Sequence, residues 1–326
     1  MDKLLLISGF TIFGLNIRFY GILMSLAFIA GLLIVMHLAK QKGFDKNLPY
    51  DLILIAFPLA IVGARLNYVL FTPQNNWTFA EILSIWHGGL MIYGGVLFAG
   101  IGIAIYCIAK KYNILKVFDI IAPALILGQA IGRWGNFFNQ EAYGSLITNP
   151  NFQWFPFGVW IEQQHFTSEA IEQIAAAGIS ATDGAWFNAT FFYESLWCFL
   201  GFFLLFYLCK KTNKTGLCTA TYFAYYGIER FFVEMLRTDS LYLGNVKISV
   251  LVSAILFVAG LSYLICLLVK DVRQKKLAVS STNTPQPQNP STAKIQISQK
   301  NNSKGKKAVP NGNSKNNPNA NKNGKI

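Results

Sequence analysis

Long apolar runs separated by short polar segments are the main pattern along this chain. Seven windows have about 20 mostly apolar residues, the length that crosses the hydrocarbon core of a membrane, at residues 19–39, 52–71, 90–109, 118–138, 191–208, 217–236 and 248–269. Because apolar and polar positions do not alternate within these windows, we expect helices rather than barrel strands. The pattern predicts an all-α polytopic membrane protein with seven transmembrane helices.

Lysines mark alternate connections between the windows. They follow the first, third and fifth windows, as Lys40, Lys42, Lys46, Lys110, Lys111, Lys116, Lys210, Lys211 and Lys214. Residues 72–89 and 139–190 contain neither Lys nor Arg. By the positive-inside rule, the N-terminus is predicted outside the cell and the C-terminus in the cytoplasm.

Charge and composition separate the last part of the chain from the rest. Charged residues are only 13% of the whole, yet residues 271–326 hold eleven Lys or Arg against one acid, Asp271. This segment is rich in Asn and Ser and has no aromatic residue, so it can form neither a core nor a base-stacking surface. The sequence predicts a helical membrane domain at 1–270 and a disordered cytoplasmic tail at 271–326 that meets membrane lipids. We expect no nucleic-acid partner.

The segment 139–190 is the longest connection and is predicted to lie on the outer face. It carries Trp154, Phe155, Phe157 and Trp160, which suit an interfacial aromatic belt. Thr167 precedes a short predicted helix at 168–177 that ends before a glycine. The segment is interpreted either as a lid or arm over the helices or as a passive connection.

Other features of the sequence exclude common functional classes. The five cysteines have neither metal-ligand nor disulfide spacing and are interpreted as packing residues. No metal or organic cofactor is expected. The first apolar stretch lacks the small-residue cleavage site of a signal peptide, so we expect the first helix to be retained.

Polar residues inside the windows are the candidates for chemistry. An arginine at the centre of a bilayer costs roughly 2.5 to 3.5 kcal/mol, so it usually faces a cavity, a partner or a substrate. Helical spacing places such residues on common faces, in the sets Gln129, Arg133 and Asn136, and Arg230, Glu234 and Arg237. Arg65, Asn67, Tyr193 and Glu194 complete the polar set.

Two interpretations of these arginines remain open. Guanidinium groups match the geometry of phosphate with paired hydrogen bonds, so an anionic lipid headgroup is one candidate ligand. Alternatively, the arginines neutralise Glu141, Glu194, Glu229 and Glu234 inside the bundle.

Several separated motifs resemble those of the prolipoprotein diacylglyceryl transferase family. Residues 132–144 match the family pattern Gly-Arg-x-Gly-Asn-Phe-x-Asn-x-Glu-x-x-Gly at each fixed position. The segments 17–21, 63–66 and 226–237 resemble the first, second and sixth helices of the family. The resemblance covers about residues 17–261 and leaves out the tail.

The resemblance implies the roles of the site residues. Arg133 and Arg230 would hold the lipid phosphate, with Asn136, Asn139, Glu141 and Gly144 shaping the site, Tyr20 lining it, Glu234 orienting Arg230, and Arg65 on the second helix contributing to binding. Tyr93 occupies a position where some members of the family have histidine.

The resemblance also implies the reaction. The family moves the diacylglyceryl group of phosphatidylglycerol to the cysteine of a lipoprotein signal peptide, the lipobox cysteine, and releases glycerol phosphate. A cysteine thiol has a pKa near 8.5 and reacts as the thiolate, so a base or a positive field must favour its deprotonation. Glu141 and Tyr93 remain equal candidates for the base, and His87 is a weaker one.

Two other classes of protein share some of these features. Buried charges also occur in small-solute transporters, but no inverted repeat relates the two halves of this chain. A photoreceptor with a lysine-bound chromophore would need a lysine inside the last window, and Lys247 and Lys270 lie only at its ends.

Overall fold

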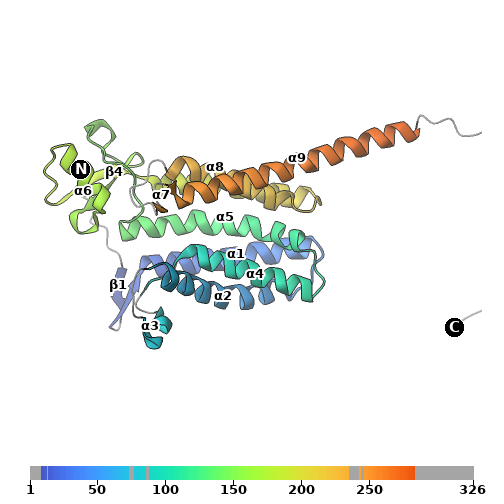
Figure 1. The fold of residues 1–326 in the computed structure, drawn as a ribbon, viewed down its shortest axis with the longest axis horizontal. Coiled ribbons are helices and arrows are strands. Elements are labelled where there is room, and N and C mark those ends of the chain that lie inside the picture. Colours follow the sequence, from blue (N-terminus) through green and yellow to red (C-terminus); the bar gives the residue numbers. More distant parts are fainter. Residues whose placement is uncertain are drawn as a thin grey trace, which may run out of the picture. The chain divides into compact units, whose positions relative to one another are not determined.

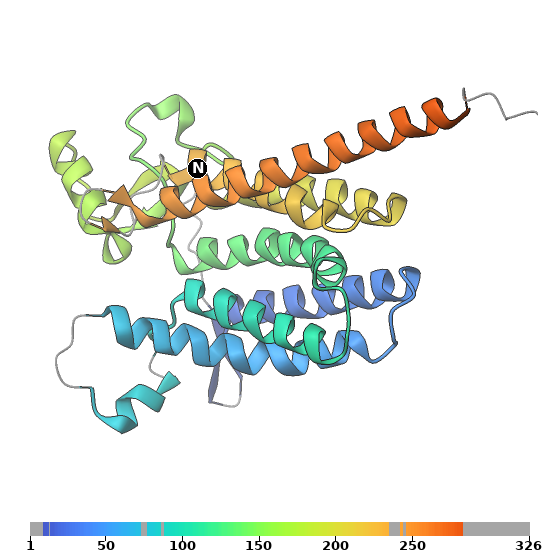
Figure 2. The ribbon, with the colours of Figure 1, turned by 45° about the vertical axis from the view of Figure 1, so that its right-hand side comes forward.

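The computed structural model describes residues 9–12, 14–72, 77–85, 88–234, 242–243 and 246–282. The chain divides into two compact units, Met1–Asp271 and Val272–Ile326. Seven long helices are described, of which α9 begins in the first unit and ends in the second: α1 (Phe19–Gln41), α2 (Leu48–Phe71), α4 (Ile92–Ala109), α5 (Ile114–Asn139), α7 (Thr190–Lys211), α8 (Leu217–Glu234) and α9 (Ile248–Thr282). The ribbon is shown in Figures 1 and 2.

The long helices agree with the seven predicted spans. Six of them are long and apolar enough to cross a membrane, and the exception is α8. Helix α8 has 18 residues and carries Glu229, Arg230 and Glu234. The prediction of a helical, multi-pass membrane protein is therefore confirmed.

Two predictions fall partly or wholly outside the described residues. The predicted tail starts at 271, but α9 continues to Thr282, and residues 283–326 lie outside the described part. His87 and Arg237 also lie outside it.

Helix α5 is the central helix of the first unit. It packs along α1 on one side and along α7 and α8 on the other (Figure 1). Of the apolar window of α5, 44% is buried, against 11% to 33% for the other candidate spans. The remaining spans turn many large apolar side chains outward, as Leu54, Leu70 and Ile92 do, which is the arrangement expected where lipid replaces water. Side chains placed on α5 therefore reach the interior of the bundle.

Helices α2 and α4 form a closely packed pair. A Cβ atom added to Gly63 would lie 2.4 Å from the carbonyl oxygen of Gly94, and one added to Gly94 would lie 2.2 Å from that of Gly63. Contacts this short are not possible for real side chains, so both positions need glycine for the two backbones to touch.

A buried apolar core fills the end of the bundle where α1 ends and α2 begins. It joins residues of α1, α2, α4, α5, α7 and α8, among them Leu38, Leu52, Ile103, Cys107, Ile120, Cys209 and Cys218. Cys198 is also buried, whereas Cys266 is exposed. The interpretation of the cysteines as packing residues is confirmed for these four buried thiols.

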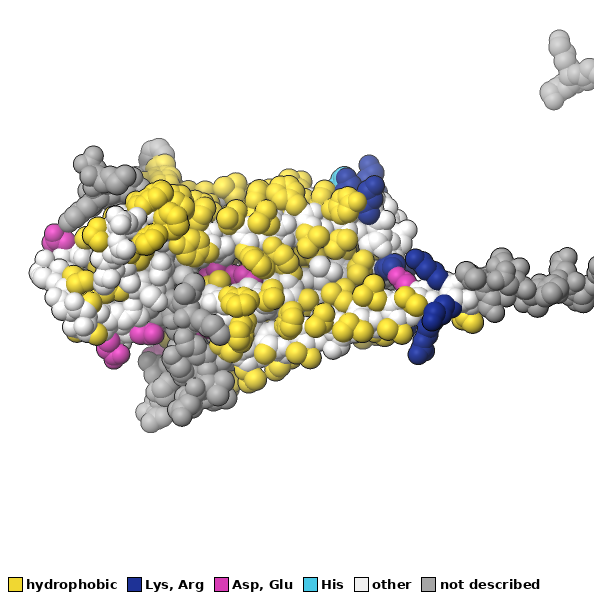
Figure 3. Space-filling model, turned by 90° about the horizontal axis from the view of Figure 1, so that it is seen from above, with side chains coloured by type: hydrophobic (Ala, Val, Ile, Leu, Met, Phe, Trp, Pro, Cys, Tyr) yellow, Lys and Arg dark blue, Asp and Glu magenta, His cyan; other side chains and the backbone are white. Residues whose placement is uncertain are grey.

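Basic side chains gather at this same end. Lys42, after α1, donates hydrogen bonds to the Thr212 carbonyl oxygen at 2.6 Å and to Asn213 Oδ1 at 3.0 Å, in the connection between α7 and α8. Figure 3 shows Lys and Arg side chains at one end of the helical body and hydrophobic side chains along its length. The Lys-rich connections therefore lie together.

The segment between α5 and α7 forms a small subdomain at the opposite end. Strands β3 (Gly158–Glu162) and β4 (Gly184–Asn188) pair antiparallel, with Trp160 opposite Trp186. They pack with helix α6 (Ser168–Ala176) around a core that includes Tyr143, Ile161 and Phe187. The Thr167 hydroxyl accepts a hydrogen bond from the Ala170 N–H, so the predicted short capped helix is confirmed.

Short elements complete the described part and were not predicted. They are the hairpin β1 (Gly9–Ile12) with β2 (Leu15–Arg18), helix α3 (Phe79–Leu83), the 3₁₀ turns η2 (Pro150–Phe152) and η3 (Gln163–His165), and the hairpin β5 (Tyr242–Leu243) with β6 (Val246–Lys247). They lie outside the long helices and leave the all-α architecture of the spans unchanged.

Candidate active site

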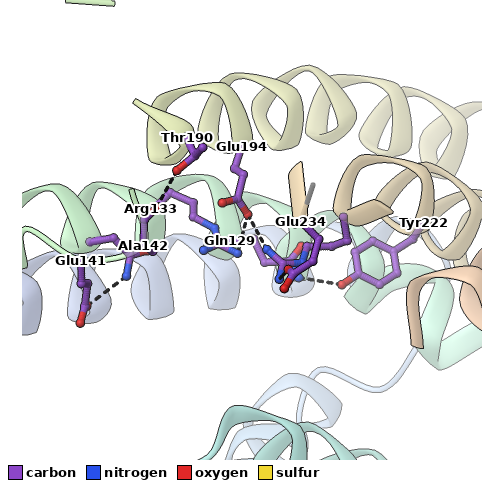
Figure 4. Close-up of polar contacts among 10 residues, drawn as sticks. Gln129, Arg133, Glu141, Ala142, Thr190, Glu194, Tyr222 and Glu234 are labelled. Atoms are coloured by element: carbon purple, nitrogen blue, oxygen red, sulfur yellow. Dashed lines mark hydrogen bonds and ion pairs between the residues drawn. The ribbon is translucent and has the colours of Figure 1, made fainter. Parts of the chain in front are cut away.

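Arg133 of α5 and Arg230 of α8 meet at a single carboxylate oxygen. Arg133 Nη2 lies 2.7 Å from Glu194 Oε2, and Arg230 Nη1 lies 3.0 Å from the same atom. Arg230 Nη2 lies 2.6 Å from Glu234 Oε2, one helical turn further along α8. Figure 4 shows Arg133 and Glu194 pointing toward one another from α5 and α7, with Glu234 beside them. The two guanidinium groups, far apart in the sequence, are thus brought together.

This charged cluster is buried. The side chain of Glu194 is 0% exposed, and those of Arg133 and Arg230 are 18% and 11% exposed. Charges removed from water need close partners, which explains why both arginines contact Glu194. A guanidinium has five N–H donors, so donors beyond those directed at the carboxylates are available to a bound anion.

The cluster lies at one end of a cavity of about 700 Å³. Arg133, Arg230, Glu234, Gln129 and Asn136 all line it, together with Tyr20, Tyr93 and Tyr226. The rest of its wall is mainly apolar and comes from α1, α2, α4 and α5. The arrangement combines a cationic end with an apolar extension, which is suited to an anionic amphiphile.

The end of α5 presents Glu141 next to this cavity. Gln140 and Ala142 have positive φ angles of 52° and 55°, so the chain turns sharply away from the helix. The amide groups of Asn136 and Asn139 donate to Glu141 Oε1 at 3.0 and 3.1 Å. Asn136 lines the cavity, so Glu141 is one side chain removed from the wall.

The turn after α5 is tied to the start of α7. Thr190 Oγ1 donates to the buried Ala142 carbonyl oxygen at 2.6 Å, and the Gly144 N–H donates to the Asn188 carbonyl oxygen at 2.9 Å. The segment 132–144 therefore has its helical part at the cavity and its turn fixed to the subdomain. This explains how a motif near the outer end of one span can position both an arginine and a carboxylate.

Arg65 lies in a different environment. Its guanidinium donates to the carbonyl oxygens of Ile82, Gly88, Gly89 and Glu81. It also faces the rings of Tyr68 and Trp77. In the described residues it holds the connection around α3 and does not line the cavity.

Helix α3 carries its own cap beside Arg65. Thr78 and Glu81 form a capping box, and the hydrogen bond from the Thr78 backbone N–H lowers the pKa of the Glu81 carboxyl group. This local order keeps the carbonyl oxygens around Arg65 in place.

Sequence reasoning brought together most of these residues but gave Glu194 no special place. The sequence marked it only as one of several carboxylates in an apolar span. The position of Glu194 in the first turns of the fifth apolar window does predict a cationic partner, because a carboxylate in a membrane span needs one. Which arginine would be that partner depends on how three helices are rotated, and the structure shows that it is both.

The fold and this site define a polytopic membrane protein that encloses an arginine pair at the head of an apolar cavity. Comparison with known proteins gives the family. The chain belongs to the prolipoprotein diacylglyceryl transferase family, whose sequence model matches residues 8–266.

Curated relatives of this family match the chain in sequence along most of their length. A phosphatidylglycerol--prolipoprotein diacylglyceryl transferase of Finegoldia magna is 42% identical over 275 residues, which cover 84% of this chain and 97% of the relative. Proteins with the same name from Clostridium kluyveri and Clostridium botulinum are 40% and 37% identical, over 79% and 81% of this chain and 95% and 98% of their own lengths. None of these three relatives is named as a transporter.

Proposed function

We propose that this chain transfers the diacylglyceryl group of phosphatidylglycerol to the thiol of the lipobox cysteine of prolipoproteins. The reaction forms a thioether bond between the cysteine sulfur and the terminal glyceryl carbon. It breaks the bond between that carbon and the phosphate oxygen, and glycerol phosphate leaves with the bonding electrons. The observation that carries the proposal is the convergence of Arg133 and Arg230 at the head of one cavity.

The arginine pair suits both stages of this reaction. In the ground state the guanidinium groups would bind the phosphate through paired hydrogen bonds. As the carbon–oxygen bond breaks, negative charge grows on the leaving phosphate, and donors already in place stabilise it without reorganisation. Tyr20 and Asn136 line the same cavity, Glu234 orients Arg230, and Asn139 and Gly144 fix the turn that carries Glu141.

The first test is to remove each arginine. We expect Arg133→Ala and Arg230→Ala each to lower transfer by at least 10² to 10³, the loss found when one transition-state donor is removed. The measurement is the thioether product formed from phosphatidylglycerol vesicles and a signal peptide with one cysteine, followed by mass spectrometry.

Two controls make this test specific. Arg133→Lys keeps the positive charge but loses the paired N–H donors of the guanidinium group, so we expect it to retain more activity than Arg133→Ala but less than the unmodified protein. Arg273→Ala, in the exposed end of α9, should leave transfer unchanged. Near-normal turnover by Arg133→Ala or Arg230→Ala would reject the arginine pair as the phosphate site.

We also propose that the N-terminus lies outside the cell and the C-terminus in the cytoplasm. The support is that the Lys-rich connections lie together at one end of the bundle, where Lys42 contacts the connection between α7 and α8. The arginine cluster and the subdomain then face the outer side, where signal peptides would meet the enzyme.

A reporter experiment tests this orientation. Alkaline phosphatase joined within the subdomain connection at residues 179–183 should be active, and the same reporter after Lys214 should be inactive. The opposite pair of results would reverse the topology.

A further inference from the structure

We propose that the apolar part of the cavity binds an acyl chain of the lipid substrate lengthwise, and that Gly31 and Gly128 keep this passage open for long chains. The inference rests on the proposed function, because it takes the headgroup to be held at Arg133 and Arg230. It goes further by assigning a subsite that selects lipids by chain length.

The cavity has the length of one acyl chain. Beyond Asn136, the α5 wall of the cavity runs from Arg133, in the charged cluster, to Ile121. These residues are twelve positions apart, or about 18 Å at 1.5 Å per residue. Half of the hydrocarbon core of a bilayer is about 15 Å thick. A chain that starts at the arginine pair and follows α5 would therefore extend to the far end of the cavity.

The far end is closed by packed side chains. Leu52 of α2 and Ile103 of α4 line the cavity there and are only 4% and 6% exposed. Both belong to the buried core at the basic end of the bundle, and Val35 and Ile121 pack against that core. Since packed interiors do not expand to admit extra atoms, a chain longer than the cavity has no room beyond this point.

Two glycines line the middle of the passage from facing helices. A Cβ atom added to Gly128 of α5 meets no atom within 4 Å, and one added to Gly31 of α1 meets Ala124 Cβ at 3.8 Å. Neither substitution clashes with backbone, so a side chain at either position would occupy cavity space. Glycine is thus not required for helix packing at Gly128, and its presence leaves the passage wide.

Selection between acyl chains of different length must come from their steric fit to the cavity. An acyl chain that enters the cavity leaves lipid rather than water, and lipid is as apolar as the cavity wall. Burial alone therefore contributes little preference. A steric mismatch in an apolar pocket, in contrast, changes rates by about tenfold or more for even small groups.

The experiment is a competition between lipids of different chain length. Equal amounts of dilauroyl and distearoyl phosphatidylglycerol are mixed in detergent micelles with a cysteine-containing signal peptide, and mass spectrometry gives the ratio of the two products. We expect Gly128→Leu to shift this ratio toward the short chain by about tenfold relative to the unmodified protein.

Gly100→Leu is the matched control. Gly100 lies in the middle of α4, and a Cβ atom added there also meets nothing within 4 Å, but Gly100 does not line the cavity. This variant makes the same chemical change in a transmembrane helix, so we expect an unchanged product ratio.

The outcomes separate the subsite from the function. An unchanged ratio in Gly128→Leu, or equal loss with both lipids in a correctly inserted protein, would overturn the chain subsite while transfer by the unmodified protein upholds the function. Absence of transfer by the unmodified protein with every phosphatidylglycerol would instead reject the function. If Gly128→Leu does not insert into the membrane, Gly128→Ala and Gly31→Val test the subsite instead. We expect each to shift the product ratio toward the short chain by a smaller factor, and an unchanged ratio in both would overturn the subsite.

Discussion

At the scale of single residues, the shared contact of two arginines with Glu194 is the feature with the clearest consequence. The carboxylate holds both guanidinium groups near one another and also competes with a phosphate for them. We therefore propose that Glu194 is a positioning residue, which keeps the donors aligned for the transition state and lowers the affinity for the lipid phosphate.

We predict a split in the kinetic constants of Glu194→Gln. Loss of the charge removes the competitor, so KM for phosphatidylglycerol should fall or stay the same. Loss of alignment should lower kcat by about 10²-fold, because small misplacements of catalytic groups have effects of this size. Steady-state kinetics in lipid–detergent micelles measure both constants, and a thermal melt checks that the variant is folded. A raised KM with unchanged kcat would contradict the positioning role.

Tyr93 and Glu141 are the two candidate residues for the base that deprotonates the substrate cysteine. Tyr93 lines the cavity, and Glu141 is held beside it by two amides. Two amide donors fix the orientation of the Glu141 carboxylate, and we therefore propose Glu141 as the base.

We expect Glu141→Gln to lower kcat by about 10² to 10⁴, the usual contribution of general base catalysis, and Tyr93→Phe to lower it by less than tenfold. The measurement is the dependence of kcat on pH for both variants. The reverse order of losses would identify the phenol as the base. Equal, small losses would assign deprotonation to the field of the arginines.

At the scale of elements, Asp119 of α5 determines where α8 starts. Its carboxylate accepts hydrogen bonds from the Gly216 N–H at 2.6 Å, the Thr219 N–H at 2.9 Å and the Thr219 hydroxyl at 2.8 Å. The Thr219 N–H belongs to the first turn of α8 and the Gly216 N–H lies just before it, and Asp119 is 7% exposed. One side chain of the central helix thus caps the helix that carries Arg230.

Removal of this cap should destabilise the bundle without acting on the chemistry. We predict that Asp119→Ala lowers the free energy of unfolding by about 2 kcal/mol, because it leaves buried donors without an acceptor. Asp119→Asn keeps one acceptor oxygen and should lose less. Thermal unfolding in detergent measures both, with KM for the lipid expected to stay unchanged. Equal melting temperatures for Asp119→Ala and the unmodified protein would contradict the cap.

At the scale of the whole molecule, the sequence predicted the spans well because membrane thickness limits their length. The window 191–208 corresponds to α7 (Thr190–Lys211), and 118–138 to α5 (Ile114–Asn139). The motif at 132–144 and the charges of the sixth window likewise identified both arginines. These features depend on local composition and spacing, which a single chain displays directly.

Features that depend on contacts between distant helices were not predictable. The cap at Asp119 joins residues about one hundred positions apart. The hairpin β3–β4 was missed because its strands are five residues long, and so was the contact of Trp160 with Trp186 across that hairpin. Periodicity gives the faces of each helix, but the rotation of one helix against another is set by packing of the complete bundle.

The contact between Gly63 and Gly94 has a mechanical consequence. Helices α2 and α4 supply one wall of the cavity, and their backbones touch at these two glycines. Because backbone meets backbone there, movement of one helix pushes directly on the other. We therefore expect α2 and α4 to move as one unit when a bulky ligand enters, so the stiffness of this helix pair opposes widening of the cavity on that side.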